Sequence, residues 1–250
     1  MSSELPFKIY SFEPQGPAKK LDGAAIIVLQ EWWGINDTIK NHGQRIANNT
    51  GAHTFIPDLY KGKIGLTAEE ASHLMSNLDW QVAAKEMKQL AEHLRKQGYS
   101  KLGAIGFCMG GALSLVLATV LADTEQPLQA AVTCYGTPSA DAFDVTKITN
   151  ATAVQGHFGG KDSMAGFSDP AAADALEAKL KNASDVTIYR YPEQGHAFLN
   201  DDDWSIEKRK ELGFVDKSIE PVSAEQAVRD TAWNRIYSFF IKHLGCNASL

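Results

Sequence analysis

Three side chains that could together carry out nucleophilic catalysis are spread along the chain: Cys108, Asp162 and His196. A thiol attacks an electrophilic carbon once its proton has been removed, and a histidine is the usual group to take that proton and later give it to the leaving group. An aspartate hydrogen-bonded to the other ring nitrogen fixes the tautomer of the histidine and stabilises its charged form. Cys108 is therefore the candidate nucleophile, His196 the base and Asp162 the supporting acid.

The residues around Cys108 are typical of a sharp turn from a strand into a helix. Gly106, Gly110 and Gly111 surround it in the spacing G-x-C-x-G-G, which is the nucleophile-elbow pattern with sulfur in place of oxygen. Such a turn strains the backbone at the nucleophile and leaves no room for a Cβ on its neighbours, a need that glycine meets. The helix N-terminus that follows would favour a thiolate. The alternative interpretation is a small buried cysteine that only packs.

Two backbone N–H groups are expected to form an oxyanion hole, those of Met109 and Trp32. Met109 directly follows the nucleophile, and Trp32 lies in the loop after an apolar strand, the two places from which such N–H groups come. Trp33 is a candidate substrate contact, because adjacent tryptophans can form a flat apolar wall. Glu31 is unusual, since a carboxylate beside a thiol raises the pKa of the thiol. It is either a gate on thiolate formation or one half of a structural ion pair.

The elements that must position these residues alternate along the chain. Short apolar runs predict strands at Ala24–Leu29, Thr54–Ile56, Leu102–Ile105, Ala130–Tyr135, Thr152–His157 and Val186–Tyr191. Helical patterns and caps predict helices at Thr38–Asn49, Thr67–Met75, Trp80–Gln97, Gly110–Leu121, Pro170–Lys181 and Ala224–His243. This alternation predicts a single α/β domain over residues 1–250, with a mostly parallel central sheet and helices on both faces.

Ligands gather at the carboxyl ends of the strands in such sheets, and each candidate residue follows a predicted strand. The order nucleophile, acid, base along the chain is that of the α/β-hydrolase fold. One rim of the sheet is therefore expected to assemble Cys108, Asp162 and His196.

Composition narrows the choice of partners and location. The chain has 24 basic and 30 acidic residues, a net charge of −6, which argues against nucleic acid or an anionic membrane as the main partner. No basic stretch leads into an apolar core at the start, and apolar runs such as Leu113–Ala122 are too short to span a bilayer. Cys108, Cys134 and Cys246 form an odd set without a C-x-x-C pair, so we expect no disulfide framework or zinc knuckle and a cytoplasmic location.

Taken in order, the motifs resemble those of the dienelactone hydrolase (carboxymethylenebutenolidase) family of α/β-hydrolases. They are Gln30-Glu31-x-x-Gly34, Pro57-Asp58-Leu59-Tyr60, Gly106-Phe107-Cys108-Met109-Gly110-Gly111, Tyr135-Gly136, Gly160-Lys161-Asp162 and Gly195-His196-Ala197-Phe198. The resemblance implies a Cys-His-Asp triad that hydrolyses a small ester or lactone through an acyl-enzyme thioester, without a cofactor. It also implies that Glu31 holds the resting thiol protonated and helps to deprotonate it when substrate binds.

One departure concerns the substrate. The family enzyme that acts on dienelactone binds the substrate carboxylate with arginines, one of them a few residues beyond the catalytic histidine, where this chain has Leu199-Asn200-Asp201-Asp202-Asp203. Neither asparagine nor acids can replace a bidentate guanidinium. Lys61, Lys63 and Arg45 are candidate sources of positive charge, and Tyr135 and Lys61 are candidate substrate contacts. The acidic run itself is typical of a solvated loop.

Other interpretations remain open from sequence. The chain could be a small-molecule binding protein of the same fold with little turnover, since fold alone does not establish function. A cysteine enzyme of the glutamine-amidotransferase class fits less well, because Met109 rather than a histidine follows the cysteine. A metal site formed by His157, Asp162 and His196 is the least favoured interpretation. His157 is also a candidate substrate contact, because it lies close to the predicted site. No role is expected for the other histidines, and the oligomeric state is left open.

Overall fold

A central sheet organises the chain in the computed structural model, which describes residues 5–215 and 221–245. The strands are β1 (Ile9–Phe12), β2 (Ala24–Leu29), β3 (His53–Pro57), β4 (Lys101–Phe107), β5 (Ala130–Cys134), β6 (Ala153–Gly159) and β7 (Val186–Tyr191). The helices are α1 (Asp37–Thr50), α2 (Ala68–Ser76), α3 (Trp80–Lys96), α4 (Met109–Leu121), α5 (Pro170–Lys179), α6 (Asp203–Glu211) and α7 (Pro221–Leu244), with one 3₁₀ turn at Val145–Lys147.

The sheet has seven strands in the order β1-β3-β2-β4-β5-β6-β7. Neighbouring strands from β3 to β7 pair in parallel, and only β1 runs antiparallel, against β3. Every residue of β2 and β5 is buried, as expected for apolar runs that are covered on both faces of a parallel sheet. The prediction of a mostly parallel α/β sheet is confirmed.

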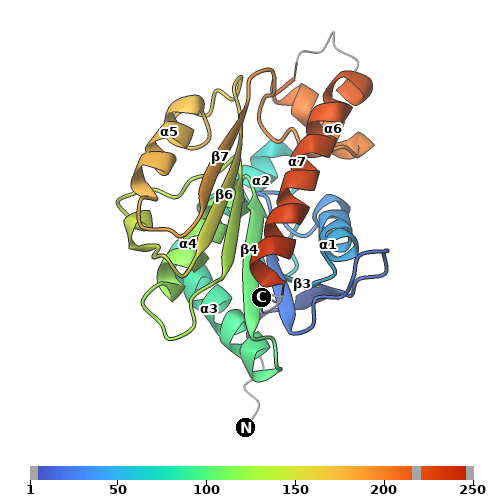
Figure 1. The fold of residues 1–250 in the computed structure, drawn as a ribbon. Coiled ribbons are helices and arrows are strands. Elements are labelled where there is room, and N and C mark those ends of the chain that lie inside the picture. The colour runs from blue at the N-terminus through green and yellow to red at the C-terminus, as the bar shows by residue number, and fades with distance from the viewer. Residues whose placement is uncertain (1–4, 216–220, 246–250) are drawn as a thin grey trace.

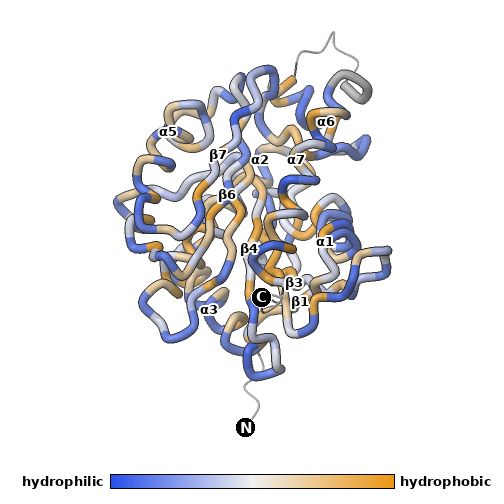
Figure 2. The backbone as a smooth tube through the Cα atoms, in the orientation of Figure 1, coloured by the Kyte–Doolittle hydropathy of each residue, from blue (hydrophilic) through white to orange (hydrophobic). Residues whose placement is uncertain are grey.

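Helices cover both faces of the sheet (Figure 1). On one face α1 packs against α7, and on the other α4 contacts α3 while α5 covers β6 and β7. Each face buries its own hydrophobic cluster, and Figure 2 shows the hydrophobic stretches of the chain concentrated in the strands between these helices. Burial of these two apolar layers is the main driving force for the arrangement.

Helix ends follow the predicted capping signals. Asn36 accepts a hydrogen bond from the N–H of Ile39 at the start of α1, and Gly51 ends the helix with a φ of 78°. Thr67 and Glu70 form the predicted capping box at the start of α2. Helix α4 begins directly after Cys108. The predicted strand-to-helix turn therefore lies at the expected residue.

Two elements were not predicted. Strand β1 is a short edge strand whose side chains are mostly half-buried, so its pattern is weak. The acidic run that is typical of a solvated loop instead leads into α6: Asp202 accepts a hydrogen bond from the N–H of Ser205, and Asp203 is the first helical residue. Acidic side chains are favourable at a helix N-terminus because they oppose the positive end of its dipole.

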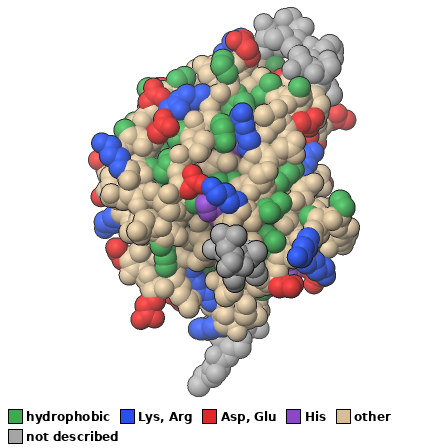
Figure 3. Space-filling model, viewed as in Figure 1, with side chains coloured by type: hydrophobic (Ala, Val, Ile, Leu, Met, Phe, Trp, Pro, Cys, Tyr) green, Lys and Arg blue, Asp and Glu red, His purple; other side chains and the backbone are tan. Residues whose placement is uncertain are grey.

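The surface of the described residues carries charged side chains of both signs. On the face drawn in Figure 3, acidic and basic side chains of the described residues are interspersed. Within residues 5–215 and 221–245, no helix combines the length and the apolar composition needed to cross a bilayer.

Candidate active site

The backbone at Cys108 is strained where β4 passes into α4. Its φ is 54° and its ψ is −118°, a conformation that a residue with a Cβ rarely adopts. A Cβ added at Gly106 would meet the carbonyl of Gly110, and one added at Gly110 would meet the carbonyl of Leu29. Only glycine lets β4, α4 and the end of β2 approach so closely. The turn presents the cysteine at the carboxyl end of the sheet.

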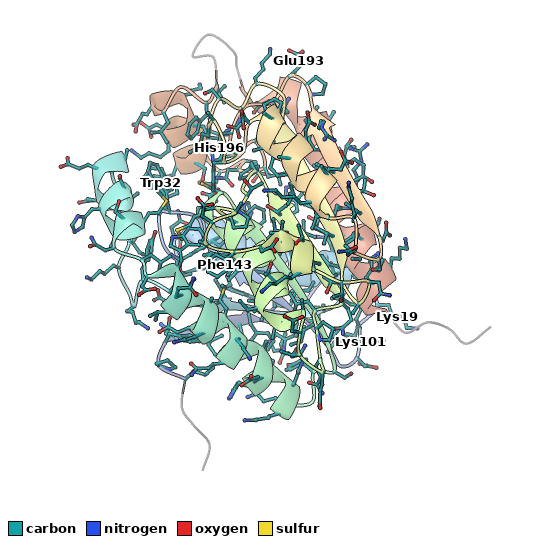
Figure 4. The ribbon with its side chains drawn as sticks, turned by 90° about the vertical axis from the view of Figure 1, so that its left-hand side faces the viewer. Lys19, Trp32, Lys101, Phe143, Glu193 and His196 are labelled. Carbon is teal, nitrogen blue, oxygen red and sulfur yellow. The ribbon has the colours of Figure 1, made fainter. Side chains whose placement is uncertain are left out.

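Asp162 and His196 lie together in the loops after β6 and β7. The Oδ2 atom of Asp162 is 2.6 Å from Nδ1 of His196, and the hydroxyl of Ser168 is 3.1 Å from the same nitrogen. The carboxylate fixes the proton on Nδ1, so Nε2 is left as the basic nitrogen. Nε2 is buried and has no hydrogen-bond partner among the described residues. Figure 4 shows His196 and Trp32 at the end of the molecule away from Lys19 and Lys101.

The sulfur of Cys108 lies close to the two backbone N–H groups that were predicted to form an oxyanion hole. The backbone N–H groups of Met109 and Trp32 both hydrogen-bond to it, which lowers the pKa of the thiol. Burial, followed by the charge of Glu31, acts in the opposite direction, and the pKa is raised well above its usual value. At rest the cysteine is therefore a neutral thiol.

Glu31 is buried and held by an amide rather than by a cation. The Nδ2 atom of Asn200 donates to both carboxylate oxygens, at 3.0 and 3.2 Å. Burial raises the pKa of Glu31 to about 7, aided by Asp202 and opposed by the Asn200 hydrogen bond and by Arg209. A carboxyl group with this pKa changes charge near neutrality.

A second hydrogen bond fixes the orientation of Asn200. Its Oδ1 atom is 3.0 Å from Nε2 of His42, which must carry a proton to donate to an amide oxygen. Burial is the main cause that lowers the pKa of His42 to about 4, so the ring is neutral. Glu31, Asn200 and His42 thus form a buried chain of hydrogen bonds behind the thiol. Sequence patterns did not assign a role to His42.

A pocket opens beside the thiol. Its cavity volume is about 140 Å³, which is smaller than a drug-sized ligand site and suits a small substrate. Its lining comprises Glu31, Trp32, Trp33, Met75, Cys108, Met164, Phe167, His196, Ala197, Asn200, Ser205, Lys208, Arg209, Leu212 and Phe214. The nucleophile candidate and the base candidate therefore face one shared space.

The structure brings some of the predicted substrate contacts to this pocket. Trp33 is part of the lining. Tyr135 is fully buried and is not part of it, although its ring lies 5.2 Å from the ring of His196. Tyr135 therefore packs edge to face against the ring of His196 and does not line the pocket. The wall residues contributed by α6 were missed by sequence analysis because that helix was not predicted.

Other predicted residues lie away from the pocket. Lys61 pairs with Glu86 of α3, Arg45 pairs with Asp201, and Lys63 lines a separate groove with Lys61. His157 contacts Gln155 and Tyr191 through its two ring nitrogens and is fully buried. In the described part of the chain, no group of three His, Cys, Asp or Glu residues is arranged to hold a metal ion.

Comparisons with known proteins show the family to which the chain is related. The model of the family described as the dienelactone hydrolase family matches residues 7–244. Protein usf of Aquifex pyrophilus is 29% identical over 90% of this chain and 90% of its own length. A carboxymethylenebutenolidase of Pseudomonas putida is 25% identical over 73% of this chain and 78% of its own length.

The fold also resembles that of a solved structure. A dienelactone hydrolase-like promiscuous phosphotriesterase from metagenomic libraries superposes with a TM-score of 0.63 at 21% identity, covering 88% of this chain and 86% of that one. Together with the parallel sheet and the elbow, this identifies the fold as that of an α/β-hydrolase.

Proposed function

This chain belongs to the dienelactone hydrolase family and is a carboxylic ester hydrolase, and we propose that it cleaves a small ester or lactone through Cys108, His196 and Asp162. The observation that carries the proposal is the pairing of Asp162 with Nδ1 of His196, which leaves Nε2 without a hydrogen-bond partner in the described part of the chain. Cys108 and His196 line the same pocket. This arrangement supports a base that acts on a thiol.

The proposed reaction begins with a displacement. The N–H groups of Met109 and Trp32 hold the resting sulfur, and the carbonyl oxygen of a substrate requires the same two donors. Substrate binding therefore moves the sulfur off these donors and towards His196. Glu31 acts as a gate, because its negative charge disfavours a thiolate at the resting position. The thiol proton ends on Nε2 of His196.

The remaining steps conserve atoms and charge. The thiolate attacks the carbonyl carbon, and the resulting oxyanion accepts hydrogen bonds from Met109 and Trp32. The oxyanion collapses, the bond to the leaving alkoxide breaks, and His196 gives that oxygen its proton, leaving a thioester on Cys108. Water then attacks the thioester while His196 takes its proton. The second oxyanion collapses, the C–S bond breaks, His196 returns the proton to the sulfur, and the acid product leaves.

The test compares two buried cysteines. Hydrolysis of p-nitrophenyl acetate and of a simple butenolide should fall at least about a thousandfold in Cys108→Ala and in His196→Ala. Cys134 is also buried, and Cys134→Ala should keep most of the activity. Equal rates in wild type and Cys108→Ala would contradict the proposal, and tight binding without turnover would point to a binding protein.

The sparse cysteines support a reducing, cytoplasmic location for such a thiol.

A further inference from the structure

The pocket beside Cys108 has largely apolar walls, and its composition bears on the class of substrate. Large apolar side chains, most of them aromatic or thioether, make up much of the lining: Trp32, Trp33, Met75, Met164, Phe167, Leu212 and Phe214. Tryptophan and phenylalanine offer large flat contact areas, and methionine adapts to irregular shapes. Trp33 also packs edge-on against Trp204, with ring centroids 5.1 Å apart. Such walls favour an aromatic or alkyl substituent.

The first cation in the lining already has its partners. Arg209 is 2% exposed, and its two terminal nitrogens each lie 3.1 Å from a carboxylate oxygen of Glu225. Its Nε atom donates to the backbone carbonyl of His196 at 3.3 Å. A fork-to-fork pair uses the donors with which a guanidinium would hold a substrate carboxylate. Arg209 therefore joins α6 to α7 and to the loop of the base instead of binding an anion.

The second cation in the lining is Lys208, whose side chain is 18% exposed. The Nζ atom of Lys208 is 2.8 Å from a carboxylate oxygen of Glu211, one turn further along α6. Its ammonium also lies 6.0 Å from the centre of the Trp204 ring. Partly exposed ion pairs of this kind are weak. Lys208 is therefore the one lining cation whose contribution to anion binding has to be measured.

Acidic residues lie at and near the reacting end of the pocket. Glu31 lines it, and Asp162 and Asp202 are close enough to influence the pKa values of Cys108 and Glu31. The amide donors of Asn200 are used by Glu31. A substrate carboxylate placed here would lose its hydration, would find both lining cations already paired with carboxylates, and would be repelled by these acids.

From the lining, the paired cations and the acids, we propose that the substrates are neutral esters or lactones with an aromatic or alkyl substituent. Substrates that carry a free carboxylate near the scissile bond are excluded. This inference rests on the proposed hydrolase function and names the substrate class of that site.

A matched pair of esters tests it. p-Nitrophenyl pentanoate and mono-p-nitrophenyl glutarate share the leaving group and the length of the acyl chain, and differ by a terminal carboxylate. Wild type should show kcat/KM for the pentanoate at least about a hundredfold higher than for the glutarate, after correction for uncatalysed hydrolysis. Equal values, or a preference for the glutarate, would overturn the inference.

Two pocket variants test the electrostatic cause. Leu212 is a half-buried wall residue that directly follows α6. Leu212→Arg places an unpaired guanidinium in the wall and should lower the pentanoate preference at least about tenfold, whereas Leu212→Met should leave the preference unchanged. Circular dichroism checks that both variants fold. An unaltered preference in Leu212→Arg, or a selective loss of glutarate hydrolysis in Lys208→Met, would contradict the inference.

A binding measurement separates this inference from the proposed function. Calorimetric titration of the Cys108→Ala protein with each ester reports affinity without turnover. If the pentanoate binds more tightly but wild type hydrolyses neither ester, the proposed hydrolase function is wrong, whereas the inferred preference of the pocket for neutral molecules holds. Equal binding of the two esters would overturn the substrate class even if wild type hydrolyses both.

Discussion

Glu31 is a buried carboxyl group whose charge raises the pKa of the Cys108 thiol. Its hydrogen-bond partner is the neutral amide of Asn200. The alternative interpretation, in which Glu31 forms a structural ion pair, therefore does not fit this partner. Without full compensation of its charge, burial raises its pKa to about 7. The group is therefore balanced between a neutral form that tolerates a thiolate and an ionised form that opposes one.

The raised pKa of Glu31 predicts a pH-dependent cost to stability. The folded state binds the proton more tightly than the unfolded chain, so the favourable contribution is complete below about pH 4.5 and is lost as the pH rises to about 7. Glu31→Gln removes this loss. The free energy of unfolding of Glu31→Gln relative to wild type should increase by on the order of 2 kcal/mol between pH 4.5 and pH 8.

Urea unfolding of both proteins at the two pH values measures this change. His42 is present in both, so its own titration cancels to first order. A difference between the two proteins that stays constant with pH would show that Glu31 is not perturbed in the folded state.

Asn200 is expected to matter for a different reason. It donates to Glu31 and accepts from His42, and Asn200→Leu removes both hydrogen bonds at similar volume. The substitution should lower the free energy of unfolding by about 2 kcal/mol at pH 8. The decrease should be smaller at pH 5, because neutral Glu31 accepts a weaker hydrogen bond than the ionised form. The exposed Asn182, whose side chain donates to the backbone carbonyl of Thr146, serves as a control, and Asn182→Leu should show no such pH dependence. A cost for Asn200→Leu that is the same at pH 5 and pH 8 would contradict this account.

At the scale of elements, the elbow between β4 and α4 depends on close backbone contact. Gly110→Ala places a Cβ against the carbonyl of Leu29, so either the end of β2 or the start of α4 must shift. We expect a loss of about 3 kcal/mol in stability and a larger loss of activity, because the shift misplaces the oxyanion donors.

Gly213→Ala is the matched control for this glycine. Gly213 has a φ of 74° and open space around it, so only backbone strain of about 1 kcal/mol is expected. Thermal unfolding and p-nitrophenyl acetate turnover of both variants provide the measurements. Equal effects of the two substitutions would show that the close approach at Gly110 does not matter.

Helix α6 shows where local patterns stop being informative. Its apolar and charged residues follow no clear amphipathic stripe, and its first turn looked like part of an acidic loop. In the fold, Asp202 caps the helix and also accepts a hydrogen bond from the Thr38 hydroxyl of α1. Arg209 ties α6 to Glu225 of α7. These partners are distant in sequence, so no short pattern could predict the helix from them.

For the whole molecule, the parallel sheet explains why the candidate site was predictable. Strands β2, β4, β6 and β7 run in the same direction, so the residues that follow them meet at one rim. Glu31, Cys108, Asp162 and His196 were found from this rule and from local motifs. The chain from Glu31 through Asn200 to His42 was not, because Asn200 and His42 are 158 residues apart in sequence.

The topology also explains which predicted contacts do not reach the site. Lys61 follows β3 and Arg45 lies in α1, and each pairs with an acid of a neighbouring element, Glu86 and Asp201. The apolar wall is provided instead by α2, by the loops after β2 and β6, and by the segment that follows α6. Substrate class is thus determined by segments that pack over the rim.

The most direct test of the whole account is the identity of the acylated residue during turnover. Wild type mixed with p-nitrophenyl pentanoate, quenched in acid and digested, should show by mass spectrometry a pentanoyl group on the peptide that contains Cys108, and Cys108→Ala should show none. Acylation of another side chain, together with undiminished turnover by Cys108→Ala, would contradict the account.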